Sequence, residues 1–165
     1  MADFKLSIDH TLNLEGGVSD HVSDRGGLTK YGISSRSYPE LDIKNLTIEK
    51  AKEIYKRDFW DKLSLDKVTS QDVAGKLFDI AVNAGWPRAG RMLQEALNKL
   101  LNDKKYLMID ALVGAKTILA VNHYKYPGEI LTTLRGLQFM HYWQIIARDP
   151  GQGVFFRGWL KRVKF

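Results

Sequence analysis

The 165-residue sequence contains no cysteine, so the protein can form neither disulfide bonds nor thiolate metal sites. Its four histidines also lack the spacing of a metal-binding motif; they are His10, His21, His123 and His141. No segment approaches the roughly 20 consecutive apolar residues that a membrane-spanning helix requires. We therefore expect no metal, no cofactor and no stable membrane insertion.

The first residues, Met1 to Leu6, do not combine a basic region with an apolar stretch, and we expect no signal peptide. The formal net charge of +6 favours an anionic partner, such as nucleic acid, a membrane surface or the bacterial cell wall. Because no nucleic-acid recognition motif is present, nucleic acid is not an expected partner.

Helical patterns dominate the sequence. Phe4, Ile8 and Leu12 recur every four residues, and Glu15 continues that helix face up to Gly16-Gly17. Residues 18–33 are polar and rich in glycine, which predicts a short β-hairpin or an irregular lobe.

From residue 47 onward the pattern is almost wholly helical. Thr47 and Ser70 are predicted N-caps, and Gly85 is predicted to end the second of these helices. Further helices are expected at about 87–101, 115–121, 127–150 and 154–163. The sequence thus predicts a mainly α fold of one domain (1–165), with a small glycine-rich lobe after the first helix. A cleft between this lobe and the helices would have Glu15 at its base.

The spacing Glu15-x8-Asp24-x4-Thr29 places two carboxylates and a hydroxyl on a short segment. A glutamate partly desolvated at a helix end can stay protonated and act as a general acid. Asp24 can then serve as a base or stabilise positive charge on a sugar, while Thr29 positions a water molecule. The same residues also fit a solvated helix end followed by an ordinary turn, and Asp20 competes with Asp24 for the role of second carboxylate.

Three aromatic or amide side chains are candidates for binding a sugar. Tyr31 lies close to Thr29 in the sequence, and Asn83 and Trp86 flank the predicted helix end at Gly85. Each also has a structural interpretation, as a hairpin aromatic, a helix-terminating residue or a core tryptophan.

The motif Glu15-Gly16-Gly17, followed by Asp24-Arg25-Gly26-Gly27-x-Thr29-x-x-Gly32-Ile33, resembles the glycoside hydrolase 108 family of phage endolysins and related muramidases. Further segments extend the resemblance over essentially the whole chain: Tyr55 to Trp60, Phe78 to Gly85, Leu93-Gln94-x-x-Leu97-Asn98, Asp110 to Thr117 and Gly158-Trp159-x-x-Arg162. The segments from Phe78 onward are similar to the predicted peptidoglycan-binding segment that accompanies the hydrolase motif. Residues 1–68 then hold the hydrolase motif and small lobe, and residues 69–165 the helical binding region.

The resemblance implies a lysozyme-like fold and cleavage of the β-1,4 bond between N-acetylmuramic acid and N-acetylglucosamine in bacterial peptidoglycan, with Glu15 as catalytic acid. Asp24 and Thr29 carry over from a similar spacing in T4-type phage lysozymes. Val18 departs from the family, in which tyrosine often follows Glu-Gly-Gly.

We expect a monomer, held in the host cytoplasm until it is released to the cell wall and periplasm as a phage endolysin; a tail-borne or secreted effector is the alternative setting. A lytic transglycosylase that gives 1,6-anhydro products and a non-catalytic peptidoglycan-binding module remain alternative functions.

Overall fold

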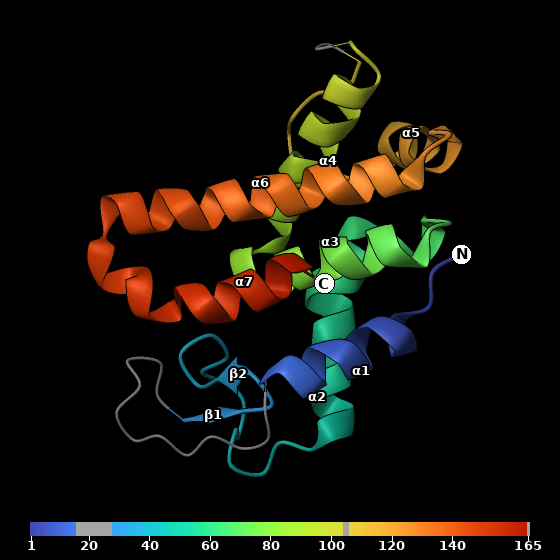
Figure 1. Cartoon of the computed structure of the whole chain (residues 1–165). Coiled ribbons are helices and arrows are strands. Elements are labelled where there is room, and N and C mark those ends of the chain that lie inside the picture. Colours follow the sequence, from blue (N-terminus) through green and yellow to red (C-terminus); the bar gives the residue numbers. More distant parts are fainter. Residues whose placement is uncertain (16–27, 104–105, 165) are drawn as a thin grey trace.

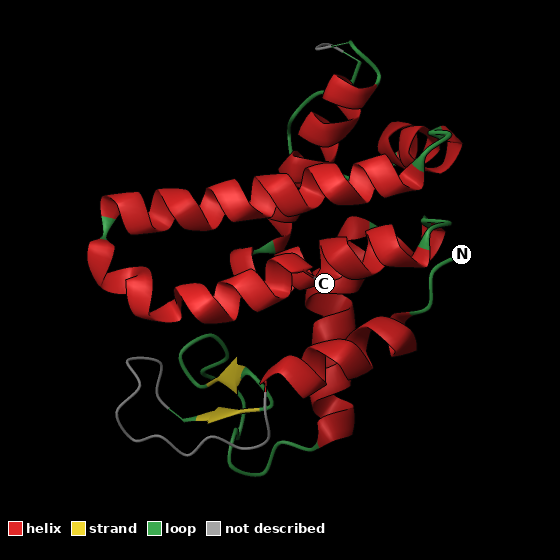
Figure 2. Ribbon diagram, in the orientation of Figure 1, coloured by secondary structure: helices red, strands yellow, loops and turns green. Residues whose placement is uncertain are grey.

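The computed structural model describes residues 1–15, 28–103 and 106–164, with only the backbone described for His10 and residues 13–15. The fold is mainly α, as predicted, with a small two-stranded hairpin after the first helix (Figures 1 and 2). The helices and strands are α1 (Phe4–Glu15), β1 (Thr29–Lys30), β2 (Ile33–Ser34), α2 (Ile48–Tyr55), α3 (Gln71–Ala84), α4 (Trp86–Leu100), α5 (Ala115–His123), α6 (Pro127–Arg148) and α7 (Phe156–Lys164). A π-helical turn (Lys56–Trp60) and two 3-10 turns (Asp61–Leu63 and Leu65–Lys67) connect α2 to α3.

Both predicted N-caps are confirmed. Thr47 Oγ1 accepts a hydrogen bond from the backbone N–H of Lys50 at 3.2 Å, and Ser70 Oγ accepts one from Val73 at 3.4 Å. Each bond satisfies a donor that the first turn of a helix leaves without an intrahelical partner. The predicted helix boundaries differ by a residue or two, most clearly before α7, where a 3-10 turn (Pro150–Phe155) replaces the expected first helical residues.

Helix α3 forms the centre of the molecule. Its residues Val73 to Ala81 are all buried, and it packs against α1, α4 and α6. Figure 1 shows α6 and α7 as a helical hairpin whose turn lies far from the chain termini. On the other side of α3, Phe4, Trp60 and Phe78 pack edge to face with ring centroids 5.6–5.7 Å apart. Over the described ranges, no helix is both long and apolar enough to cross a membrane.

Gly90 in α4 allows the loop before α5 to approach the helix closely. Gln94 Oε1 accepts a hydrogen bond from the N–H of Ala111 at 2.9 Å, and Asn98 forms two hydrogen bonds with the backbone of Leu107, each of 2.8 Å. A Cβ atom at Gly90 would lie 2.9 Å from the carbonyl carbon of Ala111 and closer still to its oxygen. Glycine is therefore required here for packing.

We expect Gly90→Ala to lower the free energy of unfolding by about 1–3 kcal/mol, because backbone atoms must move to admit the methyl group. Gly136→Ala is the matched control, since a Cβ at this exposed position in α6 meets no atom within 4 Å. Its expected effect is a gain of about 0.5–1 kcal/mol from the better helix propensity of alanine. Urea unfolding of the two variants measures both values, and equal stabilities would contradict this account of Gly90.

Candidate functional site

The expected catalytic acid, Glu15, is the last residue of α1, and its side chain lies outside the described residues. Asp24 and its rival Asp20 also lie outside them. The structure therefore places the end of α1 and the hairpin at Thr29, but the carboxylate pair remains a prediction. Helix α1 and the hairpin are anchored to the same core, because Ile8 and Ile33 are both buried in one hydrophobic cluster.

The hairpin turns at Tyr31-Gly32, where both residues have positive φ, 53° and 76°. Lys30 pairs with Ile33 across a two-residue loop, and this geometry is typical of a type I′ turn, whose twist matches that of the strands. Thr29 lies in β1 opposite Ser34. The short strands thus hold Thr29 at a fixed position in the small lobe.

Tyr31 fastens the hairpin to the helical body. The backbone carbonyl of Tyr31 accepts a hydrogen bond from the Tyr55 hydroxyl at 3.0 Å, and its ring packs half-buried against the core. The Lys30 ammonium lies 5.6 Å from the centre of that ring. These contacts give Tyr31 a structural role; its predicted role in binding sugar is not tested by them.

A second set of hydrogen bonds holds the small lobe in place, and the sequence did not predict it. The hydroxyl of Tyr38 donates a hydrogen bond to Asp58 Oδ2 at 2.9 Å, and the Arg57 guanidinium donates to both oxygens of the same carboxylate. Burial and the bond to Asp58 raise the pKa of Tyr38 to about 12. The hydrogen bond from Arg57 lowers the pKa of Asp58, which therefore stays ionised and keeps this contact intact at neutral pH.

Asn83 and Trp86 lie where α3 gives way to α4, and both side chains are half-buried. With its amide oxygen facing α7, Asn83 accepts hydrogen bonds from Arg162 Nε at 2.7 Å and Nη1 at 2.8 Å. The ring of Trp86 packs against the edge of the core. The amide oxygen of Asn83 is thus already engaged by α7, and sugar binding by these two residues remains a prediction.

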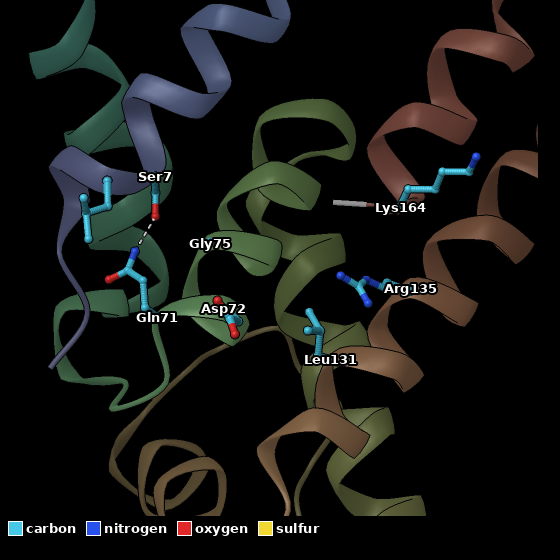
Figure 3. A pocket seen from close by; sticks show the side chains of 8 residues that line it. Ser7, Gln71, Asp72, Gly75, Leu131, Arg135 and Lys164 are labelled. Atoms are coloured by element: carbon cyan, nitrogen blue, oxygen red, sulfur yellow. Dashed lines mark hydrogen bonds between the residues drawn. The ribbon is translucent and has the colours of Figure 1, made fainter.

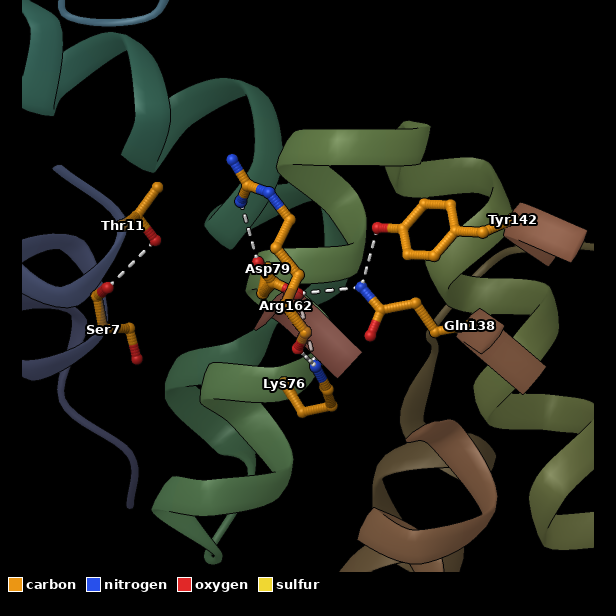
Figure 4. Close-up of polar contacts among 7 residues, drawn as sticks. All are labelled: Ser7, Thr11, Lys76, Asp79, Gln138, Tyr142 and Arg162. Carbon is orange, nitrogen blue, oxygen red and sulfur yellow. Dashed lines mark hydrogen bonds and ion pairs between the residues drawn. The ribbon is translucent and has the colours of Figure 1, made fainter. Parts of the chain in front are cut away.

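A buried polar network connects α3, α6 and α7 (Figure 4). Asp79, whose side chain is only 1% exposed, accepts hydrogen bonds from Arg162 Nη1 at 3.0 Å and Gln138 Nε2 at 2.9 Å, and lies 3.3 Å from Lys76 Nζ. Lys76 also donates to the Arg162 carbonyl at 2.5 Å. Burial lowers the pKa of Lys76, and the charge of Asp79 opposes this effect. Asp79 therefore joins the N-terminal and C-terminal halves of the chain.

A cavity of about 410 Å³ lies between α1, α3, α6 and α7, and Figure 3 shows the side chains that line it. Its walls include Ser7 and Gln71, which form a 3.0 Å hydrogen bond, and one carboxylate, Asp72. Ser7 precedes Glu15 by eight residues, or about 12 Å along a helix with a rise of 1.5 Å per residue. This cavity is therefore separate from the expected catalytic end of α1. Within the ranges that the structure covers, no group of three or more histidine or acidic side chains is arranged to hold a metal ion.

Comparisons with known proteins divide the chain at the junction of α3 and α4. Residues 8–85 match the family described as glycosyl hydrolase 108, and residues 88–164 match the family described as a predicted peptidoglycan domain. Among solved structures, the chain is similar to SagA from Brucella abortus, with 28% sequence identity and a TM-score of 0.76 over 98% of this chain and 89% of that one. No curated protein matches the sequence. The two matches confirm the resemblance that the sequence motifs indicated.

Proposed function

We propose that this chain is a peptidoglycan hydrolase and, more closely, an N-acetylmuramidase; the matches of residues 8–85 to the glycosyl hydrolase 108 family and of residues 88–164 to the predicted peptidoglycan domain support the proposal. Such an enzyme cleaves the β-1,4 bond between N-acetylmuramic acid and N-acetylglucosamine. The observation that carries the proposal is the ordered set Glu15, Asp24 and Thr29 within the hydrolase region, with Glu15 ending α1 and Thr29 in the hairpin that follows.

In the proposed mechanism Glu15 donates its proton to the glycosidic oxygen, and the bond from that oxygen to C1 of the muramic acid breaks. Positive charge develops on the sugar, and an ionised Asp24 stabilises it or accepts a proton from water. The oxygen of a water molecule positioned by Thr29 bonds to C1, and the proton that this water loses passes to Asp24 or to the ionised Glu15, whichever acts as base. Where Asp24 takes the proton, exchange with solvent returns both carboxyl groups to their starting forms. A helix C-terminus carries partial negative charge, which favours the neutral form of a carboxyl group placed there. The position of Glu15 in the chain therefore suits a general acid.

The identity of the new chain end tests the bond specificity. Digested peptidoglycan is reduced with borohydride, hydrolysed in acid and analysed for amino-sugar alcohols. We expect muramic acid to be converted to its alcohol, since a muramidase leaves muramic acid at the reducing end. Glucosaminitol in its place would show cleavage of the other glycosidic bond. Products that end in 1,6-anhydro-muramic acid would identify a lytic transglycosylase, and the absence of soluble fragments would indicate a binding module.

We also propose that the enzyme acts as a phage endolysin, kept in the host cytoplasm until the membrane is opened. The motif resemblance to phage endolysins supports this role. We expect cells that produce the protein to grow until chloroform or a pore-forming protein permeabilises the membrane, and then to lyse within minutes. Spontaneous lysis of intact cells, measured by turbidity, would contradict the proposed setting.

A further inference from the structure

A groove of about 440 Å³ runs between α4 and α6, in the half of the chain that matches the predicted peptidoglycan domain. Helix α4 contributes two arginines, and α6 contributes an imidazole and an amide. The full lining is Arg88, Arg91, Met92, Glu95, Leu137, Met140, His141 and Gln144. The apolar side chains Met92 and Leu137 lie within the groove, so the polar groups are grouped around a partly apolar floor.

The groove has an excess of positive charge. Arg88 and Arg91 are exposed, and within the described part of the chain neither guanidinium group forms an ion pair or hydrogen bond. Glu95 is the only acidic residue among the lining residues described. The pKa of the nearby Asp110 is lowered first by its hydrogen bond from Gln94 and then by the one from the backbone N–H of Leu112, with a smaller contribution from the charge of Arg91. The two guanidinium groups therefore remain available to an anionic ligand.

The pKa of His141, which lines the groove, is affected by the same positive charge. Its pKa is lowered, first by burial and then by the positive charges of Arg88 and Arg148. Arg148, at the end of α6, thus adds to the positive charge that Arg88 places near His141. A neutral imidazole and the amide of Gln144 offer hydrogen bonds to a ligand at the same place.

Helix α6 also carries two exposed apolar side chains, one of which lines the groove. Trp143 is 59% exposed and Met140, which lines the groove, is 55% exposed. The two residues are three positions apart, so they lie on one face of the helix. The ring of Trp143 also stacks on Phe139 with centroids 6.1 Å apart, which limits its movement. An exposed indole held in this way is suited to stack against the face of a sugar ring.

We propose that this groove binds the carboxylates of a peptidoglycan stem peptide while Trp143 stacks on the adjoining sugar. The inference rests on the proposed function for the nature of the polymer. Arginine pairs with carboxylates through two parallel hydrogen bonds, and peptidoglycan is a polymer in which acidic peptides branch from sugars. A concave site of this volume fits a few residues of a peptide, whereas a membrane surface requires no enclosed groove.

The test is sedimentation of the full-length protein with sacculi from a Gram-negative bacterium, which lack teichoic acids, during short incubations on ice. We expect Arg88→Gln/Arg91→Gln to bind about tenfold more weakly than the wild type, because two charge-assisted contacts are lost. Lys5→Glu is the matched control: it makes the same change of two units in net charge at an exposed position on α1, and it should bind like the wild type. Equal thermal unfolding midpoints show that the variants are folded.

Two further binding measurements identify the ligand. Amidation of the wall carboxyls should reduce wild-type binding to the level of the double variant and leave the variant nearly unchanged. Trp143→Ala should weaken binding to both native and amidated walls. Equal binding of wild type and double variant to native walls would overturn the proposal, and so would a difference seen only on phosphatidylglycerol vesicles. Failure of the wild type to release fragments from walls would contradict the muramidase assignment instead, and the binding comparison would still decide the role of the groove.

Discussion

Glu15→Gln is expected to reduce the rate of peptidoglycan hydrolysis by roughly 10²–10⁴-fold, the usual contribution of a general acid. Glutamine has nearly the same shape as glutamate but no proton to donate to the leaving oxygen. Glu15 is the last residue of α1 and its backbone is helical, so the substitution leaves the packing of Ile8 on the core unchanged. The variant should therefore remain folded and still bind to cell walls.

The measurement is the fall in turbidity of a suspension of purified walls, followed over several orders of magnitude of enzyme concentration. Glu40→Gln is the control, since Glu40 is exposed and carries the same chemical change. Asp24→Asn and Asp20→Asn, compared in the same assay, distinguish the two candidates for the second carboxylate. A wild-type rate for Glu15→Gln would remove Glu15 from the mechanism.

The second large effect is expected for Asp79→Asn, which should lower the free energy of unfolding by about 3–5 kcal/mol. Lys76 and Asp79 are 0% and 1% exposed at their side chains, and Arg162 is 13% exposed. Removing the carboxylate leaves the positive charge of Lys76 buried without its counter-charge. The loss should also loosen α6 and α7, because Gln138 and Arg162 both donate hydrogen bonds to Asp79.

The pH dependence distinguishes this electrostatic cause from a simple packing defect. Burial already lowers the pKa of Lys76, and loss of Asp79 should lower it further. Between that lowered pKa and the ordinary value of about 10.5, the unfolded chain binds more protons than the folded one, so stability rises with pH. The deficit of Asp79→Asn, measured by urea unfolding, should therefore shrink as pH increases above neutrality.

Asp66→Asn is the matched control, because Asp66 is exposed in a 3-10 turn and should tolerate the change at every pH. A variant at Asp79 as stable as the wild type would show that the network contributes little. A deficit that does not vary with pH would point to packing alone.

Features that depend on neighbouring residues could be predicted from the sequence. The caps at Thr47 and Ser70 each need only a hydroxyl and an N–H three residues later, and both are present. The polar network could not be predicted, since Asp79 meets Gln138 and Arg162 from 59 and 83 residues away. A charged residue in the apolar run Phe78-Asp79-Ile80 was the one signal that could have indicated it.

The small lobe and the candidate site likewise combine features that the sequence predicts with features that depend on residues distant in the chain. Glycine content predicted a hairpin after the first helix, but its turn lies at Tyr31-Gly32, with tyrosine at a positive φ that few such residues adopt. The position of Asn83 at a helix end makes it a candidate from the sequence alone, whereas its contact with Arg162 depends on the packing of α7 beside α3. The roles of Glu15 and Asp24 depend on the chemistry of their motif and remain predictions.

Digestion of purified peptidoglycan in water enriched in ¹⁸O, followed by mass spectrometry of the fragments, tests whether the glycosidic bond is broken by hydrolysis with Glu15 as the acid. We expect the wild type to introduce one ¹⁸O atom at each new muramic acid reducing end and Glu15→Gln to yield almost no fragments. Fragments that carry a 1,6-anhydro end and no ¹⁸O, or an equal yield from Glu15→Gln, would contradict it.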